Sequence, residues 1–551
     1  MLNKVRDRFD FWKVMTVFLI LFFVIFFAYP LFTMLIRSLQ QKDVPGLTLA
    51  NFKDFFTLKY YYSTLGHSLF VGIISTLIAT AVGTLLAYLT TRYNVVGKSA
   101  VKIMFIVAFM SPPFIGAYSW IQLLGRAGFI TKMLAKIGIE MPPIYGKPGI
   151  ILVFALNLSA YAYLYVSAAL KSIDSSLEEA AENLGASKLK RLFTVTLPVV
   201  LPTITSAMVI IFMQSLADFG TPLLIGEGYK TLPVMIYNSY LSEMGGNAYL
   251  ASAFSVIIIF VAMMILVIQK AFVSKRNYTM STMRPPQEVK LHGFKRFLVS
   301  FICWFWVFLD LLPQITVITT SFMKTKGPVF VEGWTFDHYI EVFKTMGSNI
   351  RHTLTYSTLA IILILVIGVM TAFLSVRRRK EGGALMDFLA MMPYVIPGAV
   401  LGICFIVTFN RPPILIGGTA LILIIAYTVR KMPYTIRSSV GILQQIEKSV
   451  DEASINLGVS PAKTFLKITV PLMAPGVVSG AILSWIACVN ELSSTLLLYS
   501  GKTATMSISI YTNVIKNNNG PAAAMATIMT LFIVIALVVF FKVSKGKVDI
   551  V

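Results

Sequence analysis

Long apolar runs restrict the possible folds of this chain more than any other feature. About twelve of them follow one another along the 551 residues, and each reaches the roughly 20 residues that a helix needs to cross a bilayer. Within hydrocarbon every backbone amide must be bonded inside the chain, which leaves only helices or a closed barrel. The runs lack the strict alternation of apolar and polar residues that strands show. The sequence therefore predicts an all-α polytopic membrane protein.

The runs fall into two groups with a basic, proline-containing stretch at 270–296 between them, which we interpret as a linker. The expected spans lie near residues 14–36, 65–91, 100–124, 148–170, 199–224 and 248–269, and near 297–320, 352–376, 384–409, 416–438, 474–498 and 522–542. An even number of spans in each group gives both groups the same orientation. The repeat is therefore predicted to be parallel rather than inverted.

The charge distribution predicts how the chain is oriented. Lys and Arg number 47 and Asp and Glu 24, which gives a formal net charge of +23. In a soluble protein this excess would suggest nucleic acid as a partner, but 57% of the residues are hydrophobic and the basic residues cluster between the spans. The positive-inside rule assigns such clusters to the cytoplasm. We therefore expect both termini, the linker and the polar loops at 171–198 and 444–471 to be cytoplasmic, with membrane lipid and not nucleic acid as a partner.

One polar loop occurs twice. The motif residues of its two copies are Glu179, Ala180, Ala181, Gly185 and Pro198, and Glu452, Ala453, Ser454, Gly458 and Pro471. The motif glutamates, glycines and prolines of the two copies are all 273 positions apart (452 − 179, 458 − 185 and 471 − 198). A chain that repeats a polar loop between apolar spans is expected to use it to contact the same kind of partner twice.

The motif also predicts local structure. Ser176 and Ser449 each stand three residues before a motif glutamate, which is the spacing of a capping box at a helix start. The motif glycines suit a sharp turn at the end of that helix, because glycine tolerates positive φ. Ser460-Pro461 has the composition of an N-cap and first residue, which predicts another short helix. The motif prolines stand where we expect the next membrane helix to begin.

The pattern E-A-A-x3-G-x9-I-x-L-P resembles the cytoplasmic motif of the permease subunits of binding-protein-dependent ABC importers. The resemblance extends over almost the whole chain, and Ser454 departs from the motif by replacing its second alanine. It implies the type I permease fold, with two parallel six-helix repeats at 1–269 and 297–551 joined by the linker. It also implies a bacterial cytoplasmic membrane protein whose two loops dock into two cytoplasmic ATPase subunits, and which receives substrate from an extracytoplasmic binding protein.

The segments that follow the two motifs indicate which subfamily of these permeases the chain resembles most. Ala217-Asp218-Phe219-Gly220 and the segment from Glu491 to Leu498, in one fused chain, most resemble the ferric-iron permeases. Permeases for phosphonate, thiamine, polyamine, sulfate or molybdate share much of the pattern, so another small solute is the alternative substrate. An ATP-independent secondary transporter is the alternative of a different class. Such a protein has no reason to carry the loop twice.

The sequence offers no catalytic constellation. Gly501-Lys502-Thr503 resembles the end of a phosphate-binding loop, but Leu496 stands where that motif requires its first glycine. The three cysteines and four histidines are dispersed, which predicts neither a metal site nor a cofactor. We therefore expect a transport protein that is not an enzyme and whose energy comes from the separate ATPase subunits.

Two acidic residues are candidates for the transport pathway. Asp218 and Glu491 are also 273 positions apart, and each follows its motif proline by about twenty residues, or roughly 30 Å of helix. Ionisable side chains within spans are costly and often face a cavity or a partner. The functional interpretation is an acidic pair that flanks the outer mouth of the pathway. The alternative is a structural pair of capped or salt-bridged carboxylates.

Three further residues within the expected spans are pathway candidates. Arg430 lies deeper in its span, where it would either line a path for an anion or extend to the headgroups or pair within the bundle. Pro113, which follows Pro112, and Pro393, which precedes Pro397-Gly398, fall early in the expected third and ninth spans. A proline frees a backbone carbonyl and kinks or breaks a membrane helix. These two prolines therefore predict either breaks beside the pathway or plain kinks.

Overall fold

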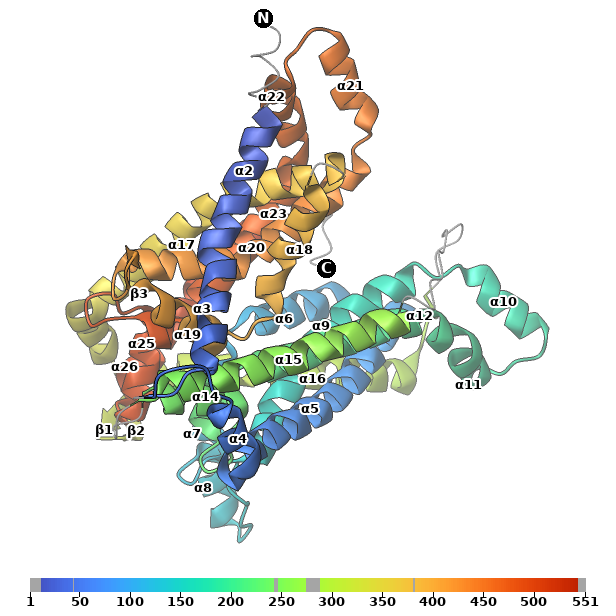
Figure 1. The fold of residues 1–551 in the computed structure, drawn as a ribbon. Helices are drawn as coiled ribbons and strands as arrows, with labels where there is room; N and C mark the ends of the chain where they lie inside the picture. The colour runs from blue at the N-terminus through green and yellow to red at the C-terminus, as the bar shows by residue number, and fades with distance from the viewer. Residues whose placement is uncertain (1–10, 43, 242–245, 274–287, 380–381, 544–551) are drawn as a thin grey trace, which may run out of the picture. The chain divides into compact units, whose positions relative to one another are not determined.

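Helices make up most of the structure, a computed structural model that describes residues 11–42, 44–241, 246–273, 288–379 and 382–543 (Figure 1). As far as residue 273 the elements are α2 (Phe11–Phe23), η2 (Val24–Ala28), α3 (Tyr29–Ser38), α4 (Ala50–Thr57), α5 (Lys59–Arg92), α6 (Lys98–Met110), α7 (Pro113–Leu124), α8 (Phe129–Lys136), α9 (Lys147–Lys171), α10 (Ser175–Asn183), α11 (Lys188–Arg191), η3 (Leu192–Thr196), α12 (Leu197–Ala217), α13 (Gly220–Ile225), α14 (Leu232–Tyr240) and α15 (Ala248–Val273). The η elements are π-helical turns. Residues 274–287 of the predicted linker lie outside the described residues.

The second part of the chain repeats much of this order and adds two small hairpins. Its elements are α16 (Gly293–Ser321), β1 (Met323–Lys326), β2 (Val329–Trp334), α17 (Asp337–Arg377), α18 (Gly383–Val395), α19 (Gly398–Phe409), β3 (Asn410–Arg411), β4 (Ile414–Leu415), α20 (Ala420–Gln445), α21 (Lys448–Asn456), α22 (Pro461–Thr464), η5 (Phe465–Thr469), α23 (Val470–Val489), α24 (Thr495–Leu498), α25 (Met506–Ile515) and α26 (Asn519–Val543). Strands β1 and β2 are neighbours, and β3 pairs antiparallel with β4 in the register Asn410↔Leu415 and Arg411↔Ile414.

The predicted all-helical polytopic fold is confirmed. Among the described residues, nine helices are long and apolar enough to cross a membrane. Two bent pairs, α6 with Pro113–Lys136 (96°) and α18 with α19 (107°), raise the number to 11 if each pair counts as one span. The segment predicted at 416–438 is the 26-residue helix α20, which is less apolar because it carries Arg430, Lys431 and Arg437.

Several predicted helix ends are displaced. Helices α5 and α17 begin at Lys59 and Asp337, well before the predicted starts at 65 and 352, because their polar first turns extend the helix beyond its apolar part. Helices α12 and α23 end at Ala217 and Val489, before the predicted ends at 224 and 498. Apolar residues continue past both ends, so hydrophobicity alone did not reveal them.

The described chain divides into two compact units that cross the predicted repeat boundaries. Unit 1 comprises the described residues of Met1–Lys53, Ile236–Val256 and Lys324–Val548, and unit 2 comprises those of Asp54–Met235 and Ile257–Met323. The first long helix of each sequence repeat, α2–α3 or α16, thus belongs to the unit that holds the later helices of the other repeat. The repeat boundaries at 269 and 297 stay a prediction about the sequence.

In unit 1 the first helices pack along the helices that follow residue 337 (Figure 1). Helix α3 contacts α19, and α2 contacts α17 and α18. The Trp12 ring stacks on Phe373 with centroids 4.5 Å apart. Helix α20 packs between α17 and α23, and α26 covers α23 and α25. Large apolar and aromatic side chains therefore fix α2–α3 to this unit.

In unit 2 the helices α5, α9 and α12 pack against one another, and α16 lies against α6 and α7. Gly83 allows the close approach of α5 to α9, because a Cβ at this position would lie 2.4 Å from the carbonyl oxygen of Ser159. Small residues at such contacts let membrane helices pack closely. The indole Nε1 of Trp306 on α16 donates to Ser159 Oγ at 3.2 Å.

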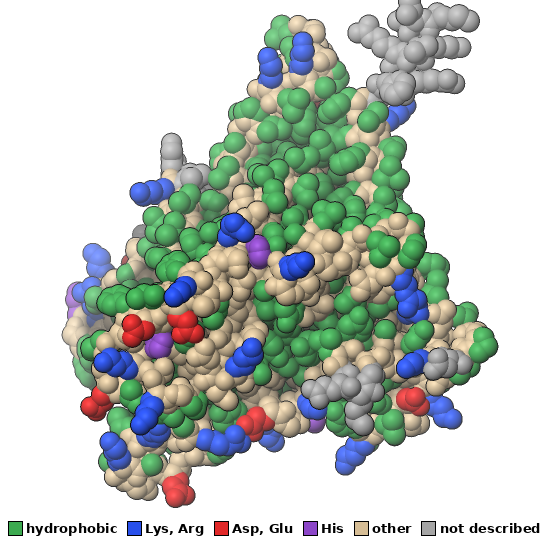
Figure 2. Space-filling model, turned by 90° about the vertical axis from the view of Figure 1, so that its left-hand side faces the viewer, with side chains coloured by type: hydrophobic (Ala, Val, Ile, Leu, Met, Phe, Trp, Pro, Cys, Tyr) green, Lys and Arg blue, Asp and Glu red, His purple; other side chains and the backbone are tan. Residues whose placement is uncertain are grey.

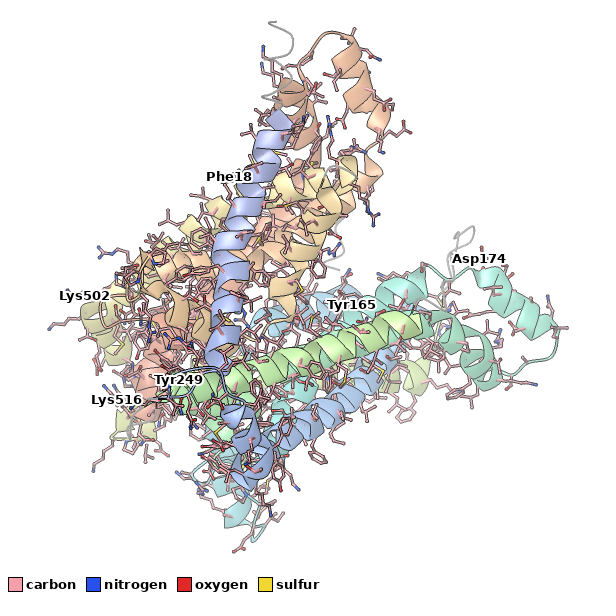
Figure 3. All side chains as sticks on the ribbon, in the orientation of Figure 1. Phe18, Tyr165, Asp174, Tyr249, Lys502 and Lys516 are labelled. Carbon is pink, nitrogen blue, oxygen red and sulfur yellow. The ribbon has the colours of Figure 1, made fainter. Side chains whose placement is uncertain are left out.

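Apolar side chains also cover broad areas of the surface, as Figure 2 shows for one face. Phe18, which is labelled in Figure 3, is 52% exposed on α2, and Phe301 on α16 is equally exposed. In water such surfaces would be costly, whereas lipid chains cover them without loss of hydrophobic free energy. The outer faces of these helices are thus suited to a bilayer.

Candidate functional site

The repeated loop has the same local fold in both copies. In the first copy α10 and α11 are joined by a turn at Gly185, and in the second copy α21 and α22 are joined by a turn at Gly458. The two glycines have φ angles of +81° and +84°, in the left-handed region that other residues adopt with strain. The turn predicted for the motif glycines is confirmed.

The capping boxes predicted for these loops are wrong. Asp174, labelled in Figure 3, is the N-cap of α10, and its Oδ1 accepts a hydrogen bond from the backbone N–H of Ser176 at 2.9 Å. The N-cap of α21 is Glu447, to which the Ser449 hydroxyl donates at 3.0 Å. Both helices begin upstream of the predicted serine, and aspartate caps a helix as well as serine does. The motif glutamates therefore do not cap these helices, and their side chains are exposed.

The acid that precedes the first motif glutamate contacts two other elements. Glu178 on α10 pairs with Arg92, the last residue of α5, with Oε1 2.5 Å from the guanidinium. The Thr196 hydroxyl, at the end of η3, donates to the same oxygen at 2.7 Å. One carboxylate thus joins α5, α10 and the base of α12.

The second copy repeats this arrangement with a shorter acid. Asp451 on α21 accepts from Arg377 Nε at 3.1 Å and from the Thr469 hydroxyl at 2.7 Å. Arg377 also donates to the carbonyl oxygen of Ile446 at 2.7 Å. We call each set of arginine, acid and threonine a clamp. Sequence reasoning missed the two clamp acids, although their 273-residue separation was a detectable signal.

Each loop exposes apolar residues next to its motif glycine. Leu184 is 88% exposed and Leu457 is 85% exposed, while Phe193 and Leu466 at matching positions are also exposed. Exposed large apolar side chains beside small residues are typical of surfaces that bind another protein. Ser454 differs from its counterpart, because its side chain is buried and its hydroxyl lies 2.9 Å from Thr464 Oγ1.

The motif prolines lie near the starts of α12 and α23, but the preceding loop helix runs into each span without a break. Lys188–Ala217 and Pro461–Val489 are each one long helix that contains a π-helical turn, η3 or η5. A proline has no N–H to donate, and its ring crowds the carbonyl four residues before it. A wider π turn at that place relieves this conflict. The prediction that the membrane helix begins at the proline is therefore only approximate.

At the other end of α12, Asp218 is the C-cap residue and stands two residues before α13 begins at Gly220. Its Oδ1 accepts from the backbone N–H of Thr221 at 2.8 Å, which caps the first turn of α13. This capping role explains why α12 ends at Ala217.

Glu491 also caps the segment that follows it, but it is in addition the centre of a buried ion cluster. Ser494 donates to Oε1 through its backbone N–H and its hydroxyl, both at 3.0 Å. Arg430 forms an ion pair with the same oxygen, and Lys431 Nζ lies 2.6 Å from Oε2. The Glu491 side chain is only 2% exposed. Its charge is compensated within unit 1, which favours the structural alternative stated for this residue.

Two membrane helices are broken near the predicted prolines, and one of the two breaks lies beside Arg430. The α6–α7 pair bends at Ser111-Pro112, and Pro113 is the first residue of α7. The α18–α19 pair bends at Ile396-Pro397, so the break predicted for Pro393 and Pro397-Gly398 lies at Pro397-Gly398, and Pro393 lies inside α18. The residue before a proline is driven out of the helical region, which explains a bend just before Pro397. A Cβ at Gly398 would lie 2.4 Å from Arg430 Nη1, so glycine leaves room for the guanidinium at this bend.

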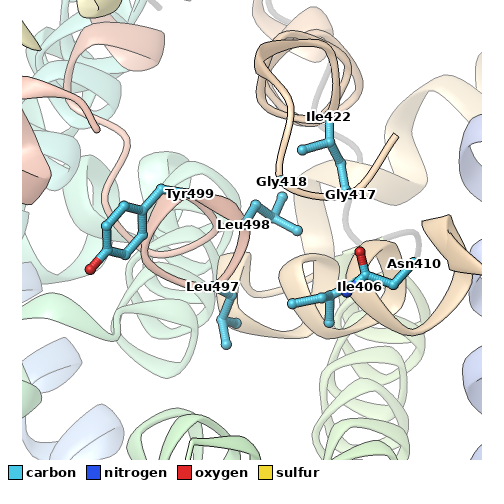
Figure 4. Close-up of a pocket in the computed structure, with 8 residues that line it drawn as sticks. All are labelled: Ile406, Asn410, Gly417, Gly418, Ile422, Leu497, Leu498 and Tyr499. Atoms are coloured by element: carbon cyan, nitrogen blue, oxygen red, sulfur yellow. The ribbon is translucent and has the colours of Figure 1, made fainter. Parts of the chain in front are cut away.

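Two further features were not found from sequence. Asp310 is a buried acid on α16 whose Oδ2 has no hydrogen-bond partner among the described residues. Unit 1 also has a pocket of about 240 Å³ beside α24, which Figure 4 shows. Its lining residues are Ile406, Asn410, Gly417, Gly418, Ile422, Leu497, Leu498 and Tyr499. Within the described part of the chain, no three His, Cys, Asp or Glu side chains gather closely enough to hold a metal ion.

Comparison with known proteins agrees with the repeated loops. Residues 79–277 and 364–548 each match the family model of the binding-protein-dependent transport system inner membrane component. The chain belongs to this family. It is therefore the multi-pass inner-membrane permease component of an ABC importer, and the two matches confirm that it carries the permease domain twice.

Two similar permeases match this chain over most of its length, and a third matches about one third of it. The ferric transport system permease protein FbpB of Actinobacillus pleuropneumoniae is 27% identical over 98% of this permease and 79% of that protein. The putative ferric transport system permease protein FbpB 1 of Haemophilus influenzae is 27% identical over 90% of this permease and 79% of that protein. The molybdenum transport system permease protein ModB of Haemophilus influenzae is 30% identical over 34% of this permease and 82% of that protein.

Proposed function

We propose that this permease imports ferric iron, which an extracytoplasmic binding protein delivers and two cytoplasmic ATPase subunits drive across the membrane. The observation that carries the coupling part of this proposal is the matching geometry of the two loops. Each presents an exposed leucine beside a motif glycine in the left-handed conformation, together with an exposed motif glutamate. A surface that recurs in this detail suits two copies of one partner.

The substrate part of the proposal is supported by the extent of the similarity. Relatives named as ferric transport permeases match this chain over 98% and 90% of its length. The relative named for molybdenum matches only one third of it. Import of molybdate or another small solute by the same importer class is the alternative, and an ATP-independent transporter is disfavoured by the duplicated loop.

If the substrate is a cation, Asp218 and Glu491 are the acids that could contact it. Because Arg430 and Lys431 compensate Glu491, we assign Glu491 to the structure of unit 1. We keep Asp218 as a candidate for substrate contact, and Arg430, Pro113 and Pro393 as residues beside the pathway. The orientation follows the basic loops: both termini, the linker and both repeated loops are assigned to the cytoplasm.

Reconstitution tests the coupling and the substrate together. The chain should purify with its ATPase at two ATPase copies per permease, and proteoliposomes should take up radioactive ferric iron when the binding protein and ATP are present. One ATPase copy, or none, would contradict the coupling proposal. Uptake of molybdate in place of ferric iron would contradict the substrate and leave the importer class intact.

Cysteine labelling tests the orientation separately. The three native cysteines are buried, so a membrane-impermeant thiol reagent gives little background. Leu47→Cys, at a position that is 72% exposed, should react from outside intact cells, and Ser187→Cys in the first loop should not. Reaction of Ser187→Cys from outside would reverse the proposed orientation.

A further inference from the structure

The strongest unassigned feature is the clamp, which occurs once in each unit. In both units one buried arginine and one threonine hydroxyl bind the same acidic side chain. The acid stands directly before the motif glutamate, on the short helix that carries the motif. The clamp therefore lies behind the exposed motif surface and does not form part of it.

The two clamps are not a simple copy of one stretch of sequence. The arginine and the acid are 86 residues apart in the first clamp and 74 residues apart in the second. The acid is glutamate in one and aspartate in the other, and Arg377 alone adds a bond to a backbone carbonyl. Despite these differences each acid binds the end of the long helix, α5 or α17, and the end of the π turn below α12 or α23. The same contact among three elements therefore forms in both units, although the number of residues between the arginine and the acid differs.

Burial makes this contact stiff. The arginine side chains are only 7% and 8% exposed, and the acids are 21% and 14% exposed. In such a poorly hydrated place an ion pair is weakly screened, and loss of one partner leaves the other charge uncompensated. When α10 moves, the ends of α5 and α12 should therefore move with it. The ends of α17 and α23 should likewise move with α21.

We propose that Glu178 and Asp451 are positioning residues that transmit movement of the ATPase-bound loop helices to the spans α5 and α12, and α17 and α23. This inference rests on the proposed docking of ATPase subunits at the loops. Docking uses the exposed motif residues, whereas transmission uses the clamp. Loss of the clamp should then leave the ATPase bound and hydrolysing ATP while less substrate is moved for each ATP.

The test is the double variant Glu178→Gln with Asp451→Asn, purified with its ATPase and reconstituted with the binding protein. We expect two ATPase copies per chain, as in the wild type, and a fall of about tenfold in radioactive ferric iron taken up per ATP hydrolysed, which is within the usual range for residues that couple two sites. A variant with the acids exchanged, Glu178→Asp with Asp451→Glu, should retain most of the wild-type ratio, because each acid already fills this position in one of the two clamps.

A matched control lies in the first loop. Glu182 pairs with Arg191, but Glu182 is 61% exposed, and Ile455 and Thr464 stand at the corresponding positions of the second loop. Glu182→Gln should therefore change the uptake ratio by less than about twofold, as for most exposed ion pairs.

Two results separate this inference from the proposed function. Absence of ATPase from the wild-type complex would overturn the docking on which the inference rests. A wild-type uptake ratio in the Glu178→Gln, Asp451→Asn variant would overturn the clamp alone. If that variant fails to accumulate in membranes, Thr196→Val with Thr469→Val removes only the hydroxyl bonds, and an unchanged ratio in this second variant would likewise overturn the inference.

Discussion

The two repeats match closely at the loop end of α12 and α23 and differ at the other end. At the loop end both have a π turn, a clamp and a glycine turn with nearly equal φ. At the other end Asp218 and Glu491 each bond to the segment that follows, but the ion cluster of Glu491 depends on Arg430 and Lys431, and the first repeat has Asn157 and Leu158 at the matching positions. This contrast fits the proposal that the two loop ends bind two copies of one partner, while the far ends of the two repeats differ in structure.

The largest expected effect is at the ion cluster. Glu491→Ala leaves two buried cations without their carboxylate, which should lower the free energy of unfolding by about 3–5 kcal/mol. The measurement is the thermal or denaturant unfolding of the purified permease, compared with Asp218→Ala. If the two variants lose the same stability, the contrast between the far ends is not real. Replacing Arg430 and Lys431 with methionine in the Glu491→Ala background should recover part of the loss, because the unpaired charges are then removed.

The next effect is at the glycine turns and should be equal in the two loops. Gly185→Val and Gly458→Val force a β-branched residue to φ near +80°, at a cost of roughly 1–2 kcal/mol each. No atom lies within 4 Å of the place that a Cβ would take at either glycine, so the cost comes from the backbone and not from a clash. We expect weaker binding of the ATPase in a pull-down titration. Asn at the same positions should be better tolerated, and a loss confined to one loop would contradict the equivalence of the two.

Asp218→Asn separates capping from substrate contact. Asparagine caps a helix about as well as aspartate, so the free energy of unfolding should change by less than about 0.5 kcal/mol. If Asp218 contacts a cationic substrate, uptake of ferric iron should fall about tenfold while ATP hydrolysis continues. Normal uptake in this variant would assign Asp218 to capping alone.

The smallest effect is at the one motif position where the loops differ. Ser454→Ala makes the second motif identical to the first at this position and removes the contact with Thr464, at a cost of about 0.5–1.5 kcal/mol. ATPase binding should stay within about threefold of the wild type. A larger loss of binding would mean that Ser454 itself shapes the docking surface.

Local rules explain which features could be predicted from the sequence. The glycine turns depend on the φ angle of one residue, and the bend at Pro112 follows from proline itself, so both were visible in the sequence. The pairing of Arg430 with Glu491 joins residues 61 positions apart, and nothing near either residue specifies the other. The N-caps were misplaced because Asp174 and Ser176 are both good caps, and the choice between them depends on where the chain enters the loop.

The packing of the first helices has a further consequence for how this protein is made. Helices α2–α3 begin the first sequence repeat but belong to unit 1, which holds most of the second repeat. Helix α16 begins the second repeat but belongs to unit 2, which holds most of the first. A ribosome therefore releases α2–α3 into the membrane some 300 residues of synthesis before its partners α17, α18 and α19 exist. Until then, lipid covers the apolar faces of α2–α3 that later contact these three helices. If the gene is cut within the linker, the first fragment lacks α16 and the second lacks α2–α3. Neither fragment alone should therefore be stable. Co-expression of the two fragments should restore the stability of both.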